Sequence, residues 1–212
     1  MSCPLHFWLN FVVSAAVALG TLSAVVVALF GRRWYPPMLK MDILNRIGEK
    51  TFTTILLANV PGDEQVRFFH IKVWNERRWS TANQTQVFLM AIEEKAPNDQ
   101  WQVTWRGNVP MRWRDQEFTS LTQTIGAPRD SDFCMVEKDR RVISLMPLIA
   151  PNNLKVYWKG PCKFIARLQA RCTEKDSEEL SVQVSWDGGW DDGDFEMRRD
   201  HLQVDIYEKH SQ

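Results

Sequence analysis

The chain has 212 residues, with 26 Lys and Arg, 26 Asp and Glu, and a formal net charge of zero. None of these charged residues precedes Gly31, so the remaining part of about 180 residues is neutral as well. A neutral part has no strong field for collecting polyanions, which argues against non-specific nucleic-acid binding, and its size suits one domain with a sizeable core.

The segment Phe11–Phe30 contains no charged residue and is as long as a helix that crosses a bilayer core of about 30 Å. It is too long for the apolar part of a signal peptide, and no Lys or Arg precedes it. We therefore expect a transmembrane anchor over residues 1–33, with its helix at about 8–30. The basic residues Arg32, Arg33 and Lys40 follow the helix, so the positive-inside rule places the N-terminus outside and the domain in the cytoplasm. Small residues along the helix would also allow a homo-oligomer to form through it.

Residues 34–212 show the alternation of apolar and polar residues that is typical of half-buried strands, with turn residues between them. The sequence predicts strands at Met38–Leu44, Ile55–Val60, Val66–Trp74, Gln86–Ile92, Trp101–Trp105, Val109–Trp113, Val142–Leu148, Val156–Trp158, Phe164–Cys172, Leu180–Trp186 and Leu202–Ile206. The pair Phe164–Cys172 and Leu180–Trp186 is predicted to form a hairpin. Loops are predicted at Asn45–Thr54, Asp115–Arg141 and Asp187–Glu196.

With no long amphipathic helix between the strands, the expected fold is an N-terminal transmembrane helix followed by a mainly-β domain. We expect residues 34–212 to form a single antiparallel β-sandwich, of which the immunoglobulin-like arrangement is one form. A β-barrel is the alternative.

The four cysteines, Cys3, Cys134, Cys162 and Cys172, form no CxxC pair and no cluster with the spacing of a zinc site. The expected cytoplasmic setting is reducing, so we expect all four to be free thiols.

The acidic, glycine-rich stretch Asp187–Glu196 has the oxygen ligands and the flexible backbone that calcium prefers, although it lacks the EF-hand spacing. The competing interpretation is a solvated loop in which Asp-Gly sets the turn. We expect no cofactor, and a calcium ion at this loop is the one exception that the sequence raises.

Arginine and tryptophan, which are frequent at protein–protein contacts, occur together at Arg77, Arg78 and Trp79 and again at Arg112 and Arg114 beside Trp113. Together with Trp190 of the acidic loop, they form the predicted interaction surface. For Trp113 in particular, period 2 predicts burial, with its neighbouring arginines on the wet face. Nucleic acid, which could also use such groups, is an unlikely partner for a neutral domain.

Sequence motifs for catalysis are missing: there is no GxSxG, Walker-type, GxGxxG or HExxH pattern. His70 is predicted to lie on the outward face of its strand. Whether the protein is an enzyme stays uncertain, with the balance against it.

The segments FFHIKVWNERRW, QVFLMAIEE, WRGNVPMRWRDQE and SWDGGWDDGDFEM…HLQV resemble a family of uncharacterised prokaryotic single-pass membrane proteins with one β-rich domain. The resemblance covers most of the chain after Arg33. It implies a prokaryotic inner-membrane setting and no particular activity.

The expected function is that of a membrane-anchored, non-enzymatic module that presents a protein-interaction surface at the cytoplasmic face. The alternative is a membrane-tethered ligand sensor or enzyme whose site is formed by the loops at 115–141 and 187–196.

Overall fold

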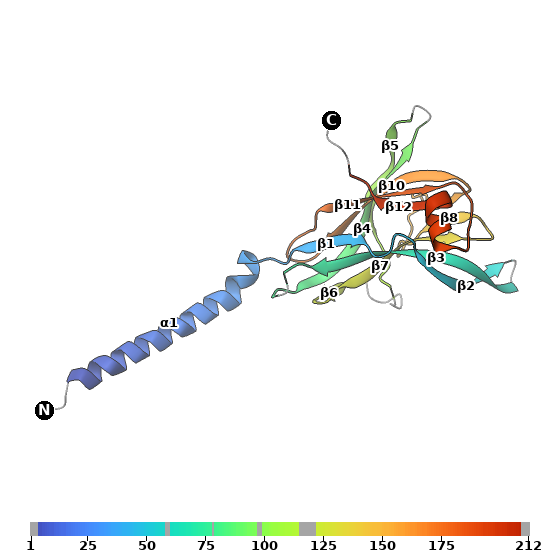
Figure 1. Ribbon diagram of the computed structural model, residues 1–212. Coiled ribbons are helices and arrows are strands. Elements are labelled where there is room, and N and C mark those ends of the chain that lie inside the picture. Colours follow the sequence, from blue (N-terminus) through green and yellow to red (C-terminus); the bar gives the residue numbers. More distant parts are fainter. Residues whose placement is uncertain (1–3, 58–59, 78, 97–98, 115–121, 209–212) are drawn as a thin grey trace.

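One long helix leads into a mainly-β domain in the computed structural model, which describes residues 4–57, 60–77, 79–96, 99–114 and 122–208 (Figure 1). Helix α1 runs from Pro4 to Trp34, so its 31 residues span about 46 Å and contain the whole predicted span. Its Trp8–Val27 stretch is long and apolar enough to cross a membrane, and none of that stretch is buried against the domain. The helix projects from one end of the domain.

The domain consists of two antiparallel sheets of six strands each. The first sheet has the order β1 (Leu39–Ile43), β3 (Val60–Asn75), β7 (Arg129–Glu137), β8 (Val142–Leu145), β9 (Tyr157–Lys159), and β2 (Glu49–Leu57) also pairs with β3. The second has the order β12 (Leu202–Ile206), β11 (Glu179–Trp186), β10 (Cys162–Arg171), β4 (Ala82–Lys95), β5 (Trp101–Pro110), and β6 (Gln123–Ile125) also pairs with β4. A short helix α2 (Asp194–Glu196) and a π-helical turn η1 (Met197–His201) precede β12.

Both sheets contribute to a single hydrophobic core, because alternation places one face of each strand inside. The predicted inward set of β3, Phe69, Ile71 and Val73, is buried. Trp158 of β9 stacks on Phe164 of β10 with ring centroids 4.1 Å apart, so an aromatic pair joins the two sheets. The predicted hairpin is confirmed as β10 and β11, which pair from Cys162 with Trp186 to Gln169 with Glu179.

The prediction of an irregular stretch over Asp115–Arg141 is wrong at residues 123–125, which form β6, and at residues 129–137, which form the central strand β7. Two features make β7 difficult to recognise in the sequence. Its register against β3 shifts between Phe69 and His70, so that Phe133 and Cys134 are both buried and the period of two is broken. Its outward residues include carboxylates, which suggest a loop until their partners are known.

Two other boundaries differ from the prediction. The expected loop over Asn45–Thr54 contains the start of β2, and β3 already begins at Val60. Residues Gly107 and Asn108, which separate two predicted strands, instead lie at an irregularity inside the continuous strand β5, where the register against β4 shifts. A Cβ atom on Gly107 would lie 2.4 Å from the Trp105 ring, so glycine is needed there for close packing.

Candidate functional site

Arg67 lies on the inward face of β3, in phase with Phe69, and its side chain is fully buried at the end of the domain away from α1. Its Nη1 donates to Asp194 Oδ1 at 2.8 Å. Its Nη2 donates to the main-chain oxygens of Asp191 at 3.3 Å and Gly193 at 3.4 Å. Because a buried charge needs a partner, the acidic loop closes this end of the domain by neutralising an arginine.

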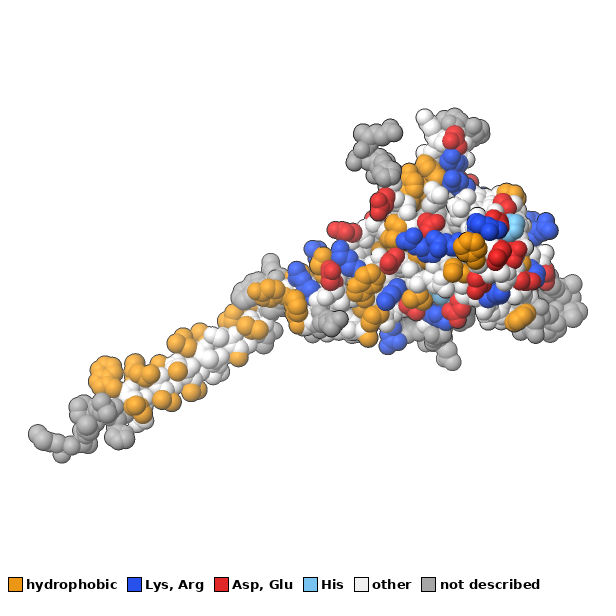
Figure 2. Space-filling model, in the orientation of Figure 1, with side chains coloured by type: hydrophobic (Ala, Val, Ile, Leu, Met, Phe, Trp, Pro, Cys, Tyr) orange, Lys and Arg blue, Asp and Glu red, His pale blue; other side chains and the backbone are white. Residues whose placement is uncertain are grey.

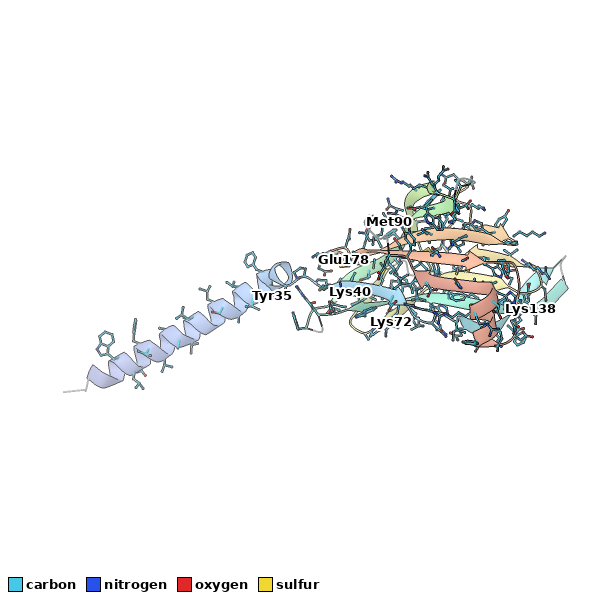
Figure 3. The ribbon with its side chains drawn as sticks, turned by 45° about the horizontal axis from the view of Figure 1, so that its top comes forward. Tyr35, Lys40, Lys72, Met90, Lys138 and Glu178 are labelled. Atoms are coloured by element: carbon cyan, nitrogen blue, oxygen red, sulfur yellow. The ribbon has the colours of Figure 1, made fainter. Side chains whose placement is uncertain are left out.

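The ring of Trp190 interacts with two cations. Its centroid lies 5.5 Å from Arg67 Cζ and 5.8 Å from Lys138 Nζ. Trp190 Nε1 donates to Asp192 Oδ1 at 2.9 Å, and Lys138 donates to the same carboxylate at 3.0 Å. These two donors lower the pKa of Asp192. Lys138, labelled in Figure 3, belongs to the β7–β8 turn. Its bond to Asp192 brings together the segments 115–141 and 187–196, which the sequence suggested as an alternative site.

The rest of the acidic loop is held by its own carboxylates. Asp187 accepts a bond from Gly189 N at 2.7 Å and from His201 Nδ1 at 2.9 Å. Burial alone would raise the pKa of Asp187, but the bonds from His201 and Gly189 outweigh it and lower that pKa. A Cβ atom on Gly189 would lie 2.3 Å from His201 Nδ1, so only glycine allows this close approach. The loop is therefore an ordered structure.

Phe195 follows Asp194 directly, and the residue is 66% exposed. It lines a groove of about 390 Å³ together with Ile47, Arg198, Arg199, Gln203 and Asp205, which we call the Phe195 groove. Arg199 stacks on the Phe195 ring at 5.3 Å. In Figure 2, Lys and Arg side chains gather around a hydrophobic patch over the α2–η1 segment.

Two arginines, Arg198 and Arg199, and one carboxylate, Asp205, are the charged residues among those that line the Phe195 groove. Asp205 is shared by two arginines, with Arg46 Nη1 at 3.3 Å and Arg198 Nη2 at 3.5 Å. Arg199 is paired with Asp200 on the same segment. An exposed aromatic ring among arginines has the composition of a protein-binding surface. The sequence contains a signal for this surface, because Phe195, Arg198 and Arg199 have the helical spacing that places three side chains on one face.

Two buried carboxylates, Glu64 of β3 and Glu137 at the end of β7, lie beside the β7–β8 turn. Glu64 accepts bonds from the backbone N–H groups of Asp139 and Arg140, both at 3.0 Å. Arg140 lies 3.5 Å from Glu64 and 3.3 Å from Glu137, so one guanidinium bridges both acids. Burial raises the pKa of Glu137, against the opposing effect of Arg140. The arrangement stabilises the turn.

His70 is 6% exposed, so the prediction of a surface imidazole is wrong. Its Nδ1 lies 3.0 Å from Asp132 Oδ1 of β7, and its Nε2 lies 3.7 Å from Glu49 Oε2 of β2. Arg114 is 2.7 Å from Glu49 and 3.9 Å from Asp130. The carboxylates of β7 that suggested a loop are thus the partners of His70 and Arg114 across the sheet.

The residues of the predicted interaction surface are spread over several places. Arg77 donates from Nη1 to Pro36 O at 2.9 Å, and the exposed Trp79 shares a cavity with Tyr35, so both lie at the helix end of the domain. Arg112 bonds through its backbone to Met146 and Asp132. Trp190 lies near Lys138, at the opposite end from Tyr35 in Figure 3. Arg78 lies outside the described residues, and Trp113 is buried as predicted.

Among the described residues, no three or more His, Cys, Asp or Glu side chains are grouped as a metal site. In the acidic loop the cationic groups of Arg67 and Lys138 already contact Asp194 and Asp192. Calcium binding by this loop stays a prediction. The described cysteines, Cys134, Cys162 and Cys172, are free thiols, as expected.

Comparison with known proteins gives no family model, no curated protein and no solved structure that matches the chain.

Proposed function

We propose that the protein is a membrane-anchored, non-enzymatic module that presents the Phe195 groove to a protein partner at the cytoplasmic face. The observation that carries the proposal is the exposed ring of Phe195 on a segment that the buried Arg67 holds in place. A rigid anchor side chain loses little conformational entropy on binding, so its apolar surface contributes fully to affinity.

The groove favours a partner segment with an apolar side chain next to an acidic one. The apolar side chain would fill the space between Phe195 and Ile47, and the acidic group would face Arg198 and Arg199. Tethering through α1 would raise the concentration of the domain relative to partners at the same membrane.

The proposal also covers the type of β domain, the orientation of the helix in the membrane and the membrane in which the protein lies. Two separate open sheets around one core support a β-sandwich over a barrel, and an immunoglobulin-like arrangement stays a prediction. The cytoplasmic orientation is supported by Arg32 and Arg33 after the apolar span, and the prokaryotic inner membrane by the sequence resemblance.

A site-specific cross-link tests the binding surface. A photoreactive p-benzoylphenylalanine at position 195 of the full chain should form one defined adduct with a protein in intact cells, and Arg199→Glu should abolish it by reversing the local charge. The matched control carries the same group in place of Tyr157, which is 64% exposed on β9, at the opposite edge of its sheet from β1. Equal labelling from both positions would refute a specific surface.

The orientation has a separate test. A reporter fused after Gln212 should be active if it works in the cytoplasm, and alkaline phosphatase at the same place should be inactive. Active phosphatase would reverse the proposed topology without bearing on the groove.

The alternative, a ligand sensor or an enzyme, is favoured by the meeting of Lys138 with the acidic loop. The charges there are largely satisfied by one another, as in the pairs of Arg67 with Asp194 and of Lys138 with Asp192. This mutual pairing supports a structural role and makes the alternative the weaker proposal.

A further inference from the structure

The chain between α1 and the first strand is fixed to the domain. Only residues 35–38 separate Trp34 from Leu39, and they include Pro36 and Pro37. Arg77 Nη1 donates to Pro36 O, Glu76 N donates to Met38 O, and Met38 N donates to Asn75 Oδ1, each at 2.9 Å. Residues of the β3–β4 loop are therefore held against the segment that follows the helix, and we call residues 35–38, 75–77 and 79–80 the junction.

The junction exposes two aromatic rings. Trp79 is 76% exposed and Tyr35 is 60% exposed. Internal hydrogen bonds order the loop itself, because Asn75 Nδ2 donates to Ser80 O at 2.6 Å and Ser80 N donates to Arg77 O at 3.1 Å. An ordered loop that leaves its tryptophan in the open is suited to a contact outside the domain.

The position of these rings relative to α1 identifies that contact. Trp79 and Tyr35 line a cavity of about 320 Å³ together with Val27, which lies three residues before Phe30, the end of the uncharged span. Since three helical residues correspond to about 5 Å, a side chain that shares a cavity with Val27 lies close to the boundary between hydrocarbon and headgroups. Trp and Tyr are enriched at this level because their rings are apolar and their N–H or O–H groups reach water.

Basic groups near the cavity agree with a lipid surface, and the acidic Asp176 and Glu178 of the adjacent loop are paired with Arg171 and Lys40. Arg32 and Arg33 follow the apolar span in the sequence, and the exposed Lys175 lies in the adjacent loop. The one acidic residue that lines the cavity, Glu174, accepts bonds from Asn83 N at 3.1 Å and Asn83 Nδ2 at 2.6 Å. Its charge is thus shared with a partner inside the domain.

We infer that the junction face, with Trp79 at its centre, lies in the headgroup region of the same bilayer that α1 crosses. The domain then rests directly on the membrane in one orientation, with the acidic loop at the far end. The inference rests on the proposed insertion of α1 and commits to phospholipid as the occupant of the cavity.

The test uses the full chain in phospholipid nanodiscs that hold one copy each. A nitroxide attached through p-acetylphenylalanine at position 79 reports collisions with oxygen, which partitions into lipid, and with a nickel chelate, which stays in water. The matched control is the same label at position 195. We expect several-fold lower nickel accessibility and higher oxygen accessibility at 79 than at 195, with unchanged circular dichroism for both labelled proteins.

The outcomes separate the two proposals. Equal nickel accessibility at 79 and 195, in a chain that resists extraction by alkaline carbonate, would overturn the lipid contact and leave the anchor intact. Extraction of the chain by carbonate would refute insertion of α1 and, with it, this inference. Protection of position 79 that is found only in discs with two copies would overturn it in favour of self-association.

Discussion

The fully buried guanidinium of Arg67 holds the carboxylate of Asp194 at 2.8 Å, one residue before the exposed ring of Phe195. A core residue of the third strand thus determines the position of a surface residue that follows the eleventh. The link joins the stability of the domain to the shape of its proposed binding surface.

Arg67→Ala is expected to lower the free energy of unfolding by about 3 kcal/mol, because it opens a cavity and leaves the main-chain oxygens at 191 and 193 without their donor. Asp194→Ala should cost about 2 kcal/mol, less than a fully buried pair would, since its carboxylate is partly solvated. Urea unfolding of the full chain in detergent micelles, followed by tryptophan fluorescence, gives both values. Losses below about 0.5 kcal/mol would contradict a structural role for the pair.

Trp158→Ala should destabilise the domain by about 4 kcal/mol, because it removes the stacked partner of Phe164 between the sheets and a 2.7 Å bond from Nε1 to Glu94. Its neighbour provides the control: Tyr157 is exposed on the same strand, and Tyr157→Ala should change stability by less than about 0.5 kcal/mol. Similar losses for the two variants, measured in the same urea experiment, would show that the aromatic pair does not join the sheets.

Asp187 should stabilise the protein in a pH-dependent way. Its pKa in the folded protein is below the ordinary value of 3.8, so its contribution is complete above about 3.8 and is lost as the pH falls below that value through the folded pKa. Asp187→Asn should therefore destabilise the protein at pH 7, and the difference from the parent should shrink as the pH falls below about 3.8.

Unfolding at several pH values measures this difference. His201→Gln should reproduce the loss at neutral pH, and the double variant should lose little more than either single one, because the two side chains form one interaction. Full additivity of the two losses would disprove the pairing.

The thiols should differ in their rates of alkylation at pH 8. Burial raises the pKa of Cys134 far above its ordinary value, raises that of Cys162 to about 12, and raises that of Cys172 less. Because the thiolate is the reactive form, iodoacetamide should modify Cys172 first and Cys134 last among the three described thiols, as followed by mass spectrometry of the native protein. Rapid modification of Cys134 without unfolding would contradict its burial.

The sequence predicted the long apolar helix and the mainly-β class well, because apolar length and period-2 alternation are local signals. Phe69, Ile71 and Val73 show the alternation in its plain form, and so do the two strands of the confirmed hairpin. The sequence-based prediction failed at β7. There the carboxylate of Asp132 is paired with His70 of β3, more than sixty positions earlier in the chain. A carboxylate paired across a sheet looks in the sequence like a carboxylate in a loop.

The candidate site shows the same limit. The acidic residues of 187–196 were visible, but the buried cation that they surround belongs to another part of the chain. Phe195, Arg198 and Arg199 have a helical spacing, yet only the structure shows that α2 and η1 form there and leave the ring exposed.

The bond between Arg67 and Asp194 connects positions 127 residues apart. During synthesis, which proceeds from the N-terminus at about 5–20 residues per second, the guanidinium emerges many seconds before its carboxylate. The nascent domain would spend that interval with one end open and a core position holding an unpaired charge. A chaperone is therefore expected to matter most for this protein until Asp194 has been made and has paired with Arg67.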